Sequence, residues 1–346
     1  MNVLYAPGSY GTLLSAPEAV ERMESIAAEA GLFITGHPMS AGGVGLIDVL
    51  RSHGPVELHG FEVLGPSGEP VYATAARRKG VWWIESAEAV GLHHLSGSGL
   101  EASSFGLGQL ILRVAHTAPG PIMIGLSDSA TVDGGIGMLQ ALGYTLRDQD
   151  DRVIKSPATG KDLSRIGRID GPAQISNTVI RVLCNDGATL VRASEVTGRR
   201  VGLSGDERQE CSRGMRILVD ALGGDPTRWA TGAAGGIAFT LATVLRAVLG
   251  PGAALMAKVT GLNDTLAEAD LVIAGGDRLE EPTQGVNASW EVHRRAEAQG
   301  RTSHALVGRI LSPTDGFAGV EEIGAMDLDS FDSAARRLCM QIASIR

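Results

Sequence analysis

The two ends of the chain alternate short apolar runs with amphipathic segments. Residues 3–6 form an apolar run that predicts a buried strand, and residues 16–30 place apolar side chains at helical spacing. Ser15 precedes this helix with Glu18 three residues later, a capping-box pattern that marks a helix start. The alternation continues with predicted strands at residues 32–35, 271–274 and 305–309. A predicted helix begins at residues 46–50, and further helices are predicted at residues 262–269, 286–298 and 328–345.

The middle of the chain follows another pattern. Residues 56–84 alternate apolar and polar side chains around a turn at residues 66–68, which predicts antiparallel strands. A polar and charged stretch at residues 147–161 predicts an exposed loop or hairpin. The remaining segments predict a strand at residues 179–184 and helices at residues 85–91, 105–116, 205–222 and 237–249, the last opened by a glycine-rich turn at residues 232–236.

These patterns predict an α/β protein of two domains. Alternating strands and helices build a parallel sheet with helices on its faces. We therefore expect a discontinuous Rossmann- or flavodoxin-like domain from residues 1–75 plus 265–346, and an inserted α/β domain with glycine-rich loops at residues 76–264. With 346 residues, each domain is long enough to bury its own core. Ligands are expected in the cleft between the two lobes.

Composition narrows the classes of function. Only 4% of the residues are aromatic and the net charge is −9, so nucleic acid is not expected as a partner. The three cysteines share no metal-ligand spacing and are expected to be buried or incidental thiols of a reducing compartment. Arg246 interrupts the most apolar region, residues 235–259, so no membrane span is expected. A cytoplasmic protein without a secretory leader follows from these features.

Residues 125–143 carry the clearest chemical signal. An apolar run leads into a small, polar, glycine-rich turn, and the turn leads into an amphipathic stretch. A strand, a tight loop and a helix start in this order favour an anion-binding site, because backbone N–H groups at a helix start point outward. Asp133 stands where it could hold a cation or accept a proton, and capping of the following helix is the alternative. Ser103 and Ser104 are expected in a mobile loop rather than in a phosphate cradle.

Residues 127–135, Ser-Asp-Ser-Ala-Thr-Val-Asp-Gly-Gly, resemble the Gly-Ser-Ala-Thr-Asn-Asp-Gly-Gly signature of the glycerate kinase family. Further segments resemble the family's motifs in the same order, so that the resemblance covers residues 3–309. These segments are Ala-Pro-Gly-Ser-Tyr at residues 6–10, Ser-Ala-Gly-Gly-Val-Gly at 40–45, Ile-Glu-Ser-Ala at 84–87, Gly-Ala-Ala-Gly-Gly at 232–236 and Leu-Val-Ile-Ala-Gly-Gly-Asp-Arg at 271–278.

The resemblance implies a glycerate-kinase-like fold and transfer of the γ-phosphoryl group of ATP, with Mg²⁺, to a hydroxyl of glycerate or a relative. It implies catalytic roles for Asp133 and Arg278, with Asp133 also the metal ligand. It places nucleotide binding at Ser129, Thr131, Gly134, Gly135, Gly232, Gly235 and Gly236, and substrate binding at Ser9, Gly42, Gly43 and Asp277. The implied partners are a nucleotide and a small anionic hydroxy acid, and a homodimer is left open.

The chain departs from the family pattern mainly at charged positions. Small or apolar residues replace the family's ionisable or amide side chains at Gly8, Gly11, Ala41, Val44, Val132, Gly276 and Val286. Because losing one preorganised electrostatic contact costs on the order of 10²–10³ in rate, ordinary glycerate kinase activity would be very weak. A catalytically silent homologue that binds a ligand or partner, and an enzyme of another class, therefore remain alternatives. Convergence of Asp128, Asp133, Asp277 and Arg278 would favour metal–phosphate chemistry.

Overall fold

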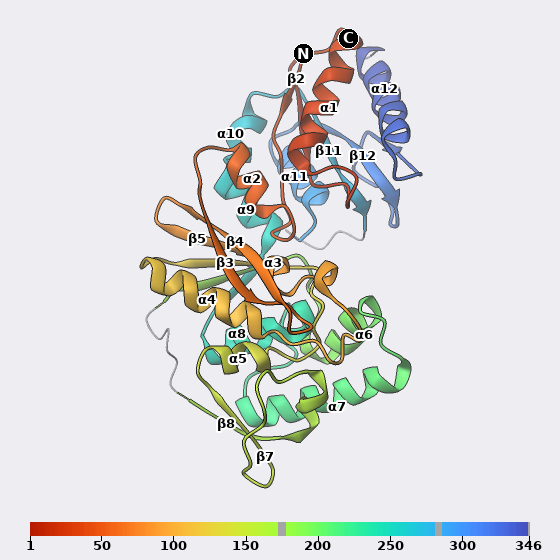
Figure 1. The fold of residues 1–346 in the computed structure, drawn as a ribbon. Helices are drawn as coiled ribbons and strands as arrows, with labels where there is room; N and C mark the ends of the chain where they lie inside the picture. Colours follow the sequence, from red (N-terminus) through yellow and green to blue (C-terminus); the bar gives the residue numbers. More distant parts are fainter. Residues whose placement is uncertain (172–177, 281–285, 345–346) are drawn as a thin grey trace. The chain divides into compact units, whose positions relative to one another are not determined.

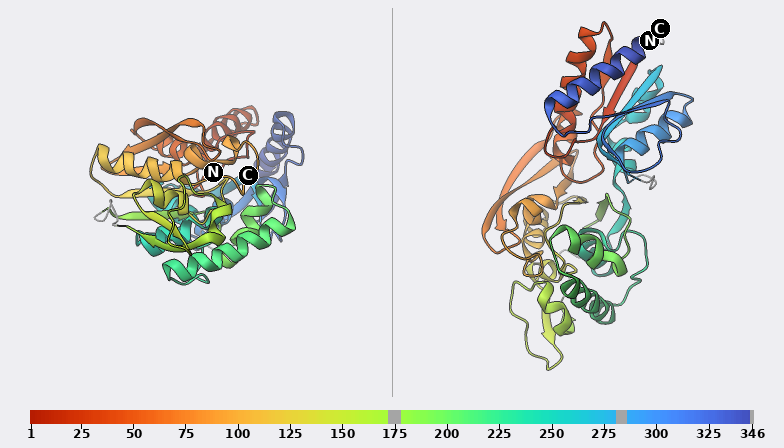
Figure 2. Two further views of the ribbon diagram at one scale, coloured as in Figure 1. Left: turned by 60° about the horizontal axis from the view of Figure 1, so that its bottom comes forward. Right: turned by 90° about the vertical axis from the view of Figure 1, so that its right-hand side faces the viewer.

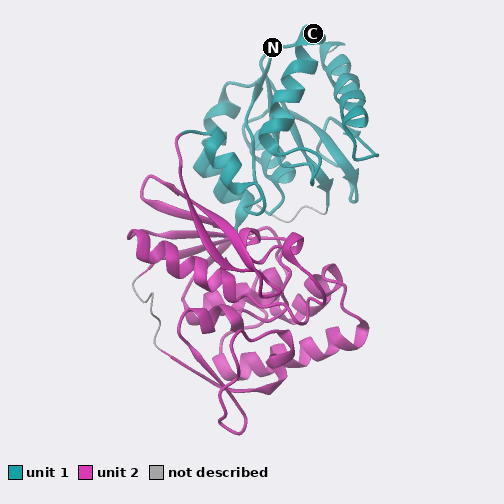
Figure 3. Ribbon diagram, in the orientation of Figure 1, with its two compact units in different colours: residues 1–54, 251–346 teal, residues 55–250 magenta. Residues whose placement is uncertain are grey.

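A computed structural model describes residues 1–171, 178–280 and 286–344 of the chain. It divides into two compact units: Met1–Gly54 with Pro251–Arg346 is unit 1, and Pro55–Gly250 is unit 2 (Figure 3). A discontinuous α/β unit interrupted by a second α/β unit is the organisation that the sequence predicts. The unit boundaries differ from the predicted ones at 75/76 and 264/265. The reason is that residues 57–78 pair with the sheet of unit 2, and residues 252–260 pack on a helix of unit 1.

Unit 1 is built on a five-stranded sheet in the order β13-β12-β11-β1-β2, in which every neighbouring pair is parallel. β1 lies between β2 and β11, so the N-terminal and C-terminal parts of the chain extend the sheet in opposite directions. This arrangement confirms the predicted Rossmann-like sheet. The strands are β1 (Val3–Pro7), β2 (Ile34–Gly36), β11 (Leu271–Leu279), β12 (Thr302–Ile310) and β13 (Gly319–Glu322).

Helices cover both faces of this sheet. Tyr5 and Ile273 point to the face on which α1 and α12 lie side by side, whereas Leu4 and Val272 point to the face covered by α10 and α11 (Figures 1 and 2). The predicted capping box of Ser15 is present at the start of α1. The helices of unit 1 are α1 (Ala16–Glu29), α2 (Leu46–Ser52), α9 (Gly252–Thr260), α10 (Leu262–Ala267), α11 (Ala288–Ala298) and α12 (Leu328–Ser344).

His37, just after β2, gives unit 1 a pH-dependent stability. Its Nε2 lies 2.9 Å from Thr260 Oγ1 and its Nδ1 lies 3.1 Å from Thr265 Oγ1. Thr260 Oγ1 donates to the carbonyl of Met256 at 3.0 Å, so His37 Nε2 carries the proton and Nδ1 accepts from Thr265. Burial, with a smaller contribution from the charge of His53, lowers the pKa of His37 from 6.5 to about 3.

We expect acid to destabilise the protein through this group. Below pH 6.5 the unfolded chain binds a proton at His37 that the folded chain binds only near pH 3. The free energy of unfolding therefore falls as pH drops through this interval, by roughly 2 kcal/mol from pH 7 to pH 5. Urea denaturation at several pH values measures the slope. His37→Gln should flatten it, and an unchanged slope in that variant would show that other groups cause the acid sensitivity.

Unit 2 contains a mixed six-stranded sheet in the order β10-β9-β6-β5-β4-β3. The predicted antiparallel strands pair as β3–β4 and β4–β5, whereas β5, β6 and β9 are mutually parallel. The polar stretch at residues 147–161 connects the separate antiparallel pair β7–β8. The strands are β3 (Glu57–Leu64), β4 (Pro70–Arg78), β5 (Val81–Glu85), β6 (Ile122–Leu126), β7 (Thr145–Asp148), β8 (Ile166–Asp170), β9 (Ile180–Cys184) and β10 (Val248–Pro251).

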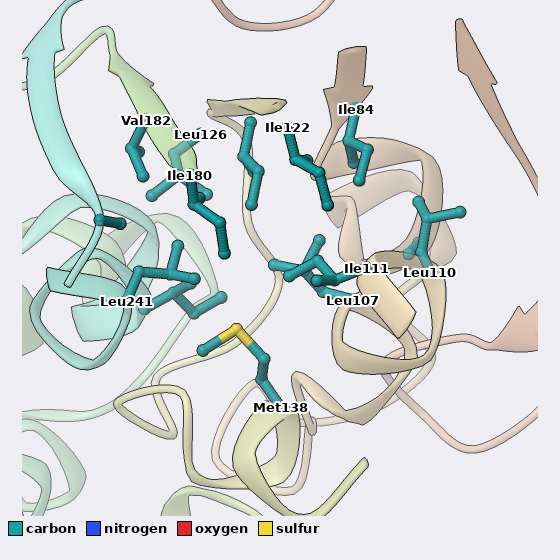
Figure 4. Packing of buried hydrophobic residues seen from close by; sticks show 14 of the residues in the cluster. Ile84, Leu107, Leu110, Ile111, Ile122, Leu126, Met138, Ile180, Val182 and Leu241 are labelled. Carbon is teal, nitrogen blue, oxygen red and sulfur yellow. The ribbon is translucent and has the colours of Figure 1, made fainter. Parts of the chain in front are cut away.

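The main core of unit 2 lies between the parallel strands and three helices. Ile122 and Val182 from the sheet meet Leu107 of α4, Met138 of α5 and Leu241 of α8 (Figure 4). This packing fixes the end of β6, where the anion-binding turn was predicted. The helices of unit 2 are α3 (Ala87–Val90), η1 (Leu92–His94), α4 (Phe105–Thr117), α5 (Ile136–Ala141), η2 (Gly160–Arg165), α6 (Leu190–Arg200), α7 (Gly205–Leu222), η3 (Ala233–Gly236) and α8 (Ile237–Val244).

The predicted helix at residues 237–249 is wrong in its second half. α8 ends at Val244, and Arg246 adopts a φ of 55°, a left-handed conformation that a helix cannot continue through. The apolar residues that follow form β10, in which Leu249 joins the core of the sheet. The pattern was misread because a short apolar run fits a buried helix and a buried strand equally well.

All three cysteines are buried and form no disulfide, as expected. Within the described parts of the chain, no helix combines the length and apolar character that crossing a bilayer requires.

Candidate functional site

The loop that follows β6 is the segment predicted to bind an anion. Asp128, its second residue, is partly exposed and has a φ of 49°, in the left-handed region that aspartate tolerates better than most residues with side chains. Ser129 and Thr131 are buried, and their hydroxyl oxygens lie 3.1 Å apart. Thr131 N also donates to Ser129 Oγ at 3.2 Å. A loop at the carboxyl end of a parallel strand is where open α/β sheets bind their ligands.

A second glycine-rich loop, residues 232–236, packs directly on the first. Gly134 N donates to the carbonyl of Gly235 at 3.1 Å, and Gly235 N donates to Thr197 Oγ1 at 3.1 Å. A Cβ built on Gly235 would lie 2.0 Å from the carbonyl oxygen of Thr131, so only glycine permits this backbone contact. The structure thus brings the seven residues predicted to bind nucleotide into one part of unit 2.

Asp133 lies at the centre of this arrangement and is fully buried. Its Oδ2 accepts hydrogen bonds from Ser104 N at 2.8 Å, Ser104 Oγ at 2.7 Å and Gly137 N at 3.2 Å. Its Oδ1 accepts one from Gly135 N at 3.0 Å. Burial raises the pKa of Asp133 above its usual value, and the hydrogen bonds from Ser104, Gly135 and Gly137 oppose that shift.

The start of α5 therefore binds a carboxyl group that belongs to the protein. The sequence reasoning expected the N–H groups of this helix start to face a ligand. Those of Gly135 and Gly137 instead donate to Asp133, and Met138 N donates to Ser104 Oγ at 2.9 Å. The catalytic and metal-binding roles of Asp133 stay predictions. Gly135 is the N-cap of α5, and Asp133, two residues earlier, accepts the N–H of Gly137 in the first turn of that helix.

A second group of predicted residues lies in unit 1, where β1 and β11 are neighbours. Asp277 N donates to the carbonyl of Ser9 at 3.0 Å, which joins the loop after β1 to the end of β11. The chain order of the sheet reverses between these two strands, and ligands of open α/β sheets bind outside the carboxyl ends of such strands. Arg278 Nε lies 3.0 Å from Asp277 Oδ2, and Arg278 Nη1 lies 3.6 Å from Glu280 Oε1.

The predicted substrate loop at residues 40–45 is also part of unit 1. Gly42 N donates to Ser40 Oγ at 3.0 Å, and Gly42 has a φ of 85°. Gly252, the first residue of α9, approaches so closely that a Cβ there would lie 1.9 Å from the carbonyl oxygen of Ala41. The start of α9 thus fixes the backbone of this loop, to which the predicted residue Gly43 also belongs.

The predicted site residues therefore form two groups. Of the four residues whose convergence was to decide the chemistry, Asp128 and Asp133 belong to unit 2, and Asp277 and Arg278 belong to unit 1. Lys161, a cation of unit 2, forms an ion pair with Glu101 on the surface. Across the described residues, no group of three or more His, Cys, Asp or Glu side chains is arranged to hold a metal ion.

Sequence reasoning gave three residues of this region no role. Ser104 is fully buried and precedes α4, rather than lying in a mobile loop, and its position before an apolar helical pattern was a usable signal. Thr197 and Thr240 bind the backbones of the two glycine loops from α6 and α8. Both are threonines inside helical segments, and the sequence offers no signal for them.

Comparisons with known proteins agree with the motifs. The family described as "Glycerate kinase family" matches residues 3–337. The glycerate kinase of Bacillus subtilis is 32% identical, covering 97% of this chain and 94% of that protein. The glycerate 2-kinase of Escherichia coli is 30% identical over 81% of this chain and 78% of its own. A crystal structure from Salmonella typhimurium LT2, described as glycerate kinase 2, has a TM-score of 0.79 at 27% identity and covers 99% of this chain and 98% of that one.

The family match spans nearly the whole chain, and the described fold is the two-part α/β architecture that the five sequence motifs implied. The chain therefore belongs to the glycerate kinase family.

Proposed function

We propose that this protein is an ATP-dependent phosphotransferase whose substrate is glycerate or a closely related small hydroxy acid. The observation that carries the proposal is the direct packing of the loops at residues 127–135 and 232–236. Glycine at these positions lets the two backbones lie directly against each other, and paired glycine-rich loops of this kind are typical of phosphate-binding sites. Family membership supplies the reaction, and named glycerate kinases among the relatives supply the substrate class.

In this proposal, unit 2 binds the nucleotide and unit 1 binds the hydroxy acid. Ser129, Thr131 and the two glycine loops contact the phosphates. Ser9, Gly42, Gly43 and Asp277 contact the substrate, and Arg278 pairs with its carboxylate through two parallel N–H donors. Arg278 would have to exchange its present partners, Asp277 and Glu280, for that carboxylate.

The residues present fit a magnesium ion carried mainly by the nucleotide. Mg²⁺ in phosphotransferases is commonly held by one or two carboxylates together with phosphate oxygens and waters, so a cage of protein ligands is not required. Asp128 is partly exposed at the edge of the phosphate loop and is the carboxylate we assign to the ion. When bound, the ion neutralises charge on the transferring phosphate.

One specific observation favours a second candidate, a homologue that binds a ligand without phosphoryl transfer. Arg278, which is proposed to bind the substrate carboxylate, is already paired with Asp277 and Glu280. In addition, this chain has the uncharged residues Ala41, Val44 and Gly276 where the family has acidic side chains. Such a protein keeps the backbone loops and lacks the groups that stabilise the transition state.

Thermal unfolding with Mg–ATP, Mg–ADP and D-glycerate, singly and together, separates these candidates. A ligand at a hundred times its Kd adds about 2.7 kcal/mol to the free energy of unfolding, which raises the Tm by roughly 4 °C in a protein of this size. We expect a rise with either nucleotide. A rise in Tm with glycerate, and with neither nucleotide, would favour the second candidate. No rise with any of the three would contradict phosphotransfer from ATP.

A further inference from the structure

The carboxylate of Asp133 joins the starts of two helices from different parts of unit 2. Ser104 is the residue before α4, and both its N–H and its hydroxyl donate to Asp133 Oδ2. Gly135 and Gly137, at the start of α5, donate to the same carboxylate. Ser104 Oγ in turn accepts from Met138 N, which closes a ring of hydrogen bonds between the two helices.

The four groups that contact the Asp133 carboxylate are all hydrogen-bond donors. Three of the four groups that contact it are backbone N–H groups, which can only donate, so the arrangement matches a carboxylate that accepts at both oxygens. A metal ion would compete for the same oxygens with four donors that the fold holds in place. Removing the carboxylate would leave three backbone donors buried without their acceptor, a costly state inside a protein.

Little free space remains around the Asp133 carboxylate. A Cβ on Gly137 would lie 2.2 Å from Ser103 Oγ and 3.0 Å from Asp133 Oδ2. The backbone of α5 therefore lies as close to the carboxylate as glycine allows. Since Asp133 has no exposed surface, the described fold gives a ligand no direct approach to it.

The network reaches the second glycine loop through Gly134. The N–H of Gly134 donates to Gly235, and its carbonyl accepts from Thr240 Oγ1. A Cβ on the next residue, Gly135, would lie 3.0 Å from the Cβ of Thr240. A shift of Asp133 would therefore move the residues that hold the loop at 232–236 against the loop at 127–135.

We propose that Asp133 is a positioning residue: an internal anion that fixes the spacing of the two glycine loops and touches neither the metal ion nor the reacting groups. The expected effect on nucleotide binding rests on the proposed function, in which these two loops bind the phosphates. It reassigns Asp133 from the catalytic and metal-binding roles that the sequence favoured. The buried carboxylate acts on the nucleotide only through the backbone that it orders.

Asp133→Asn tests the proposal, with Ser104→Ala as a second variant that removes one donor and leaves the carboxylate in place. An amide at position 133 keeps one acceptor oxygen and turns an NH₂ group toward buried N–H donors, so the loops should loosen. Asp327→Asn is the control. That exposed carboxylate accepts a hydrogen bond from Ser330 N at 2.8 Å and belongs to unit 1, outside the network.

Two readouts distinguish positioning from metal binding. Hydrogen exchange of the free protein should lose protection at residues 134–138 and 232–236 in Asp133→Asn, and to a smaller extent in Ser104→Ala. Calorimetry with ADP alone and with Mg–ADP should show both affinities reduced by the same factor, about tenfold or more, with the half-saturating Mg²⁺ concentration unchanged. Asp327→Asn should change neither readout.

Loss of Mg–ADP affinity alone, with unchanged affinity for free ADP and unchanged hydrogen exchange, would overturn the proposal and make Asp133 a metal ligand. Unchanged exchange in both network variants would overturn it as well. If the unaltered protein binds no nucleotide, the proposed function fails on its own evidence. The exchange measurement then still decides whether Asp133 clamps the loops.

Discussion

Gly235→Ala should destabilise the protein by more than about 3 kcal/mol, because its added methyl group meets both an unfavourable backbone conformation and a backbone clash. Gly235 has a φ of 66°, and its added Cβ would lie 2.0 Å from the carbonyl oxygen of Thr131 and 2.9 Å from its carbonyl carbon. The left-handed conformation itself costs about 1–2 kcal/mol. The clash adds more, because the atoms that would have to move are backbone atoms inside the paired loops.

Gly202→Ala separates these two costs. Gly202 also has a left-handed φ, of 77°, but a Cβ there would meet no atom within 4 Å. Its cost should stay near 1 kcal/mol. Urea or thermal denaturation of the two variants measures the difference. Equal destabilisation in both would mean that the two glycine loops are not packed backbone to backbone as described.

Restoring the family's carboxylates at residues 41 and 44 should raise phosphotransfer activity by about 10²-fold. The resemblance places acidic side chains where this chain has Ala41 and Val44, in the loop that the start of α9 holds. One preorganised electrostatic contact is worth on the order of 10²–10³ in rate. Val44 is 53% exposed and Ala41 is partly exposed, so Ala41→Asp with Val44→Glu should be tolerated by the fold.

Glycerate-dependent release of ADP measures this gain. Val153→Glu is the control, because it adds a carboxylate at a valine that is 62% exposed in the β7–β8 region of unit 2. Its rate should equal that of the unaltered protein. An Ala41→Asp/Val44→Glu protein that folds but gains nothing over this control would show that the lost charges do not limit the reaction.

The fold was predictable where the sequence pattern is local. Apolar periodicity and the Ser15–Glu18 capping box placed α1, and buried runs placed β1 and β11. α6 was missed because its buried face consists largely of small and polar residues, such as Ala193, Ser194 and Thr197, which give no apolar stripe.

The candidate site was predictable as a set of loops, and its internal contacts were not. Glycine patterns identified residues 127–135 and 232–236, and the structure brings these two loops together. The partners of Asp133 could not be derived, because Ser104 lies 29 residues away in sequence and is brought to it by the packing of α4 on α5. A lone aspartate before two glycines reads equally well as a ligand and as a helix cap.

The most direct test of the proposed function is to measure glycerate-dependent release of ADP by the unaltered protein. The assay contains ATP, Mg²⁺ and D-glycerate, and the product is identified by ³¹P NMR. The account predicts slow release of ADP that depends on glycerate and is matched mole for mole by phosphoglycerate. Thermal unfolding that shows both ligands bound, with no ADP released above the glycerate-free background, would contradict it and leave a ligand-binding homologue on the glycerate kinase fold.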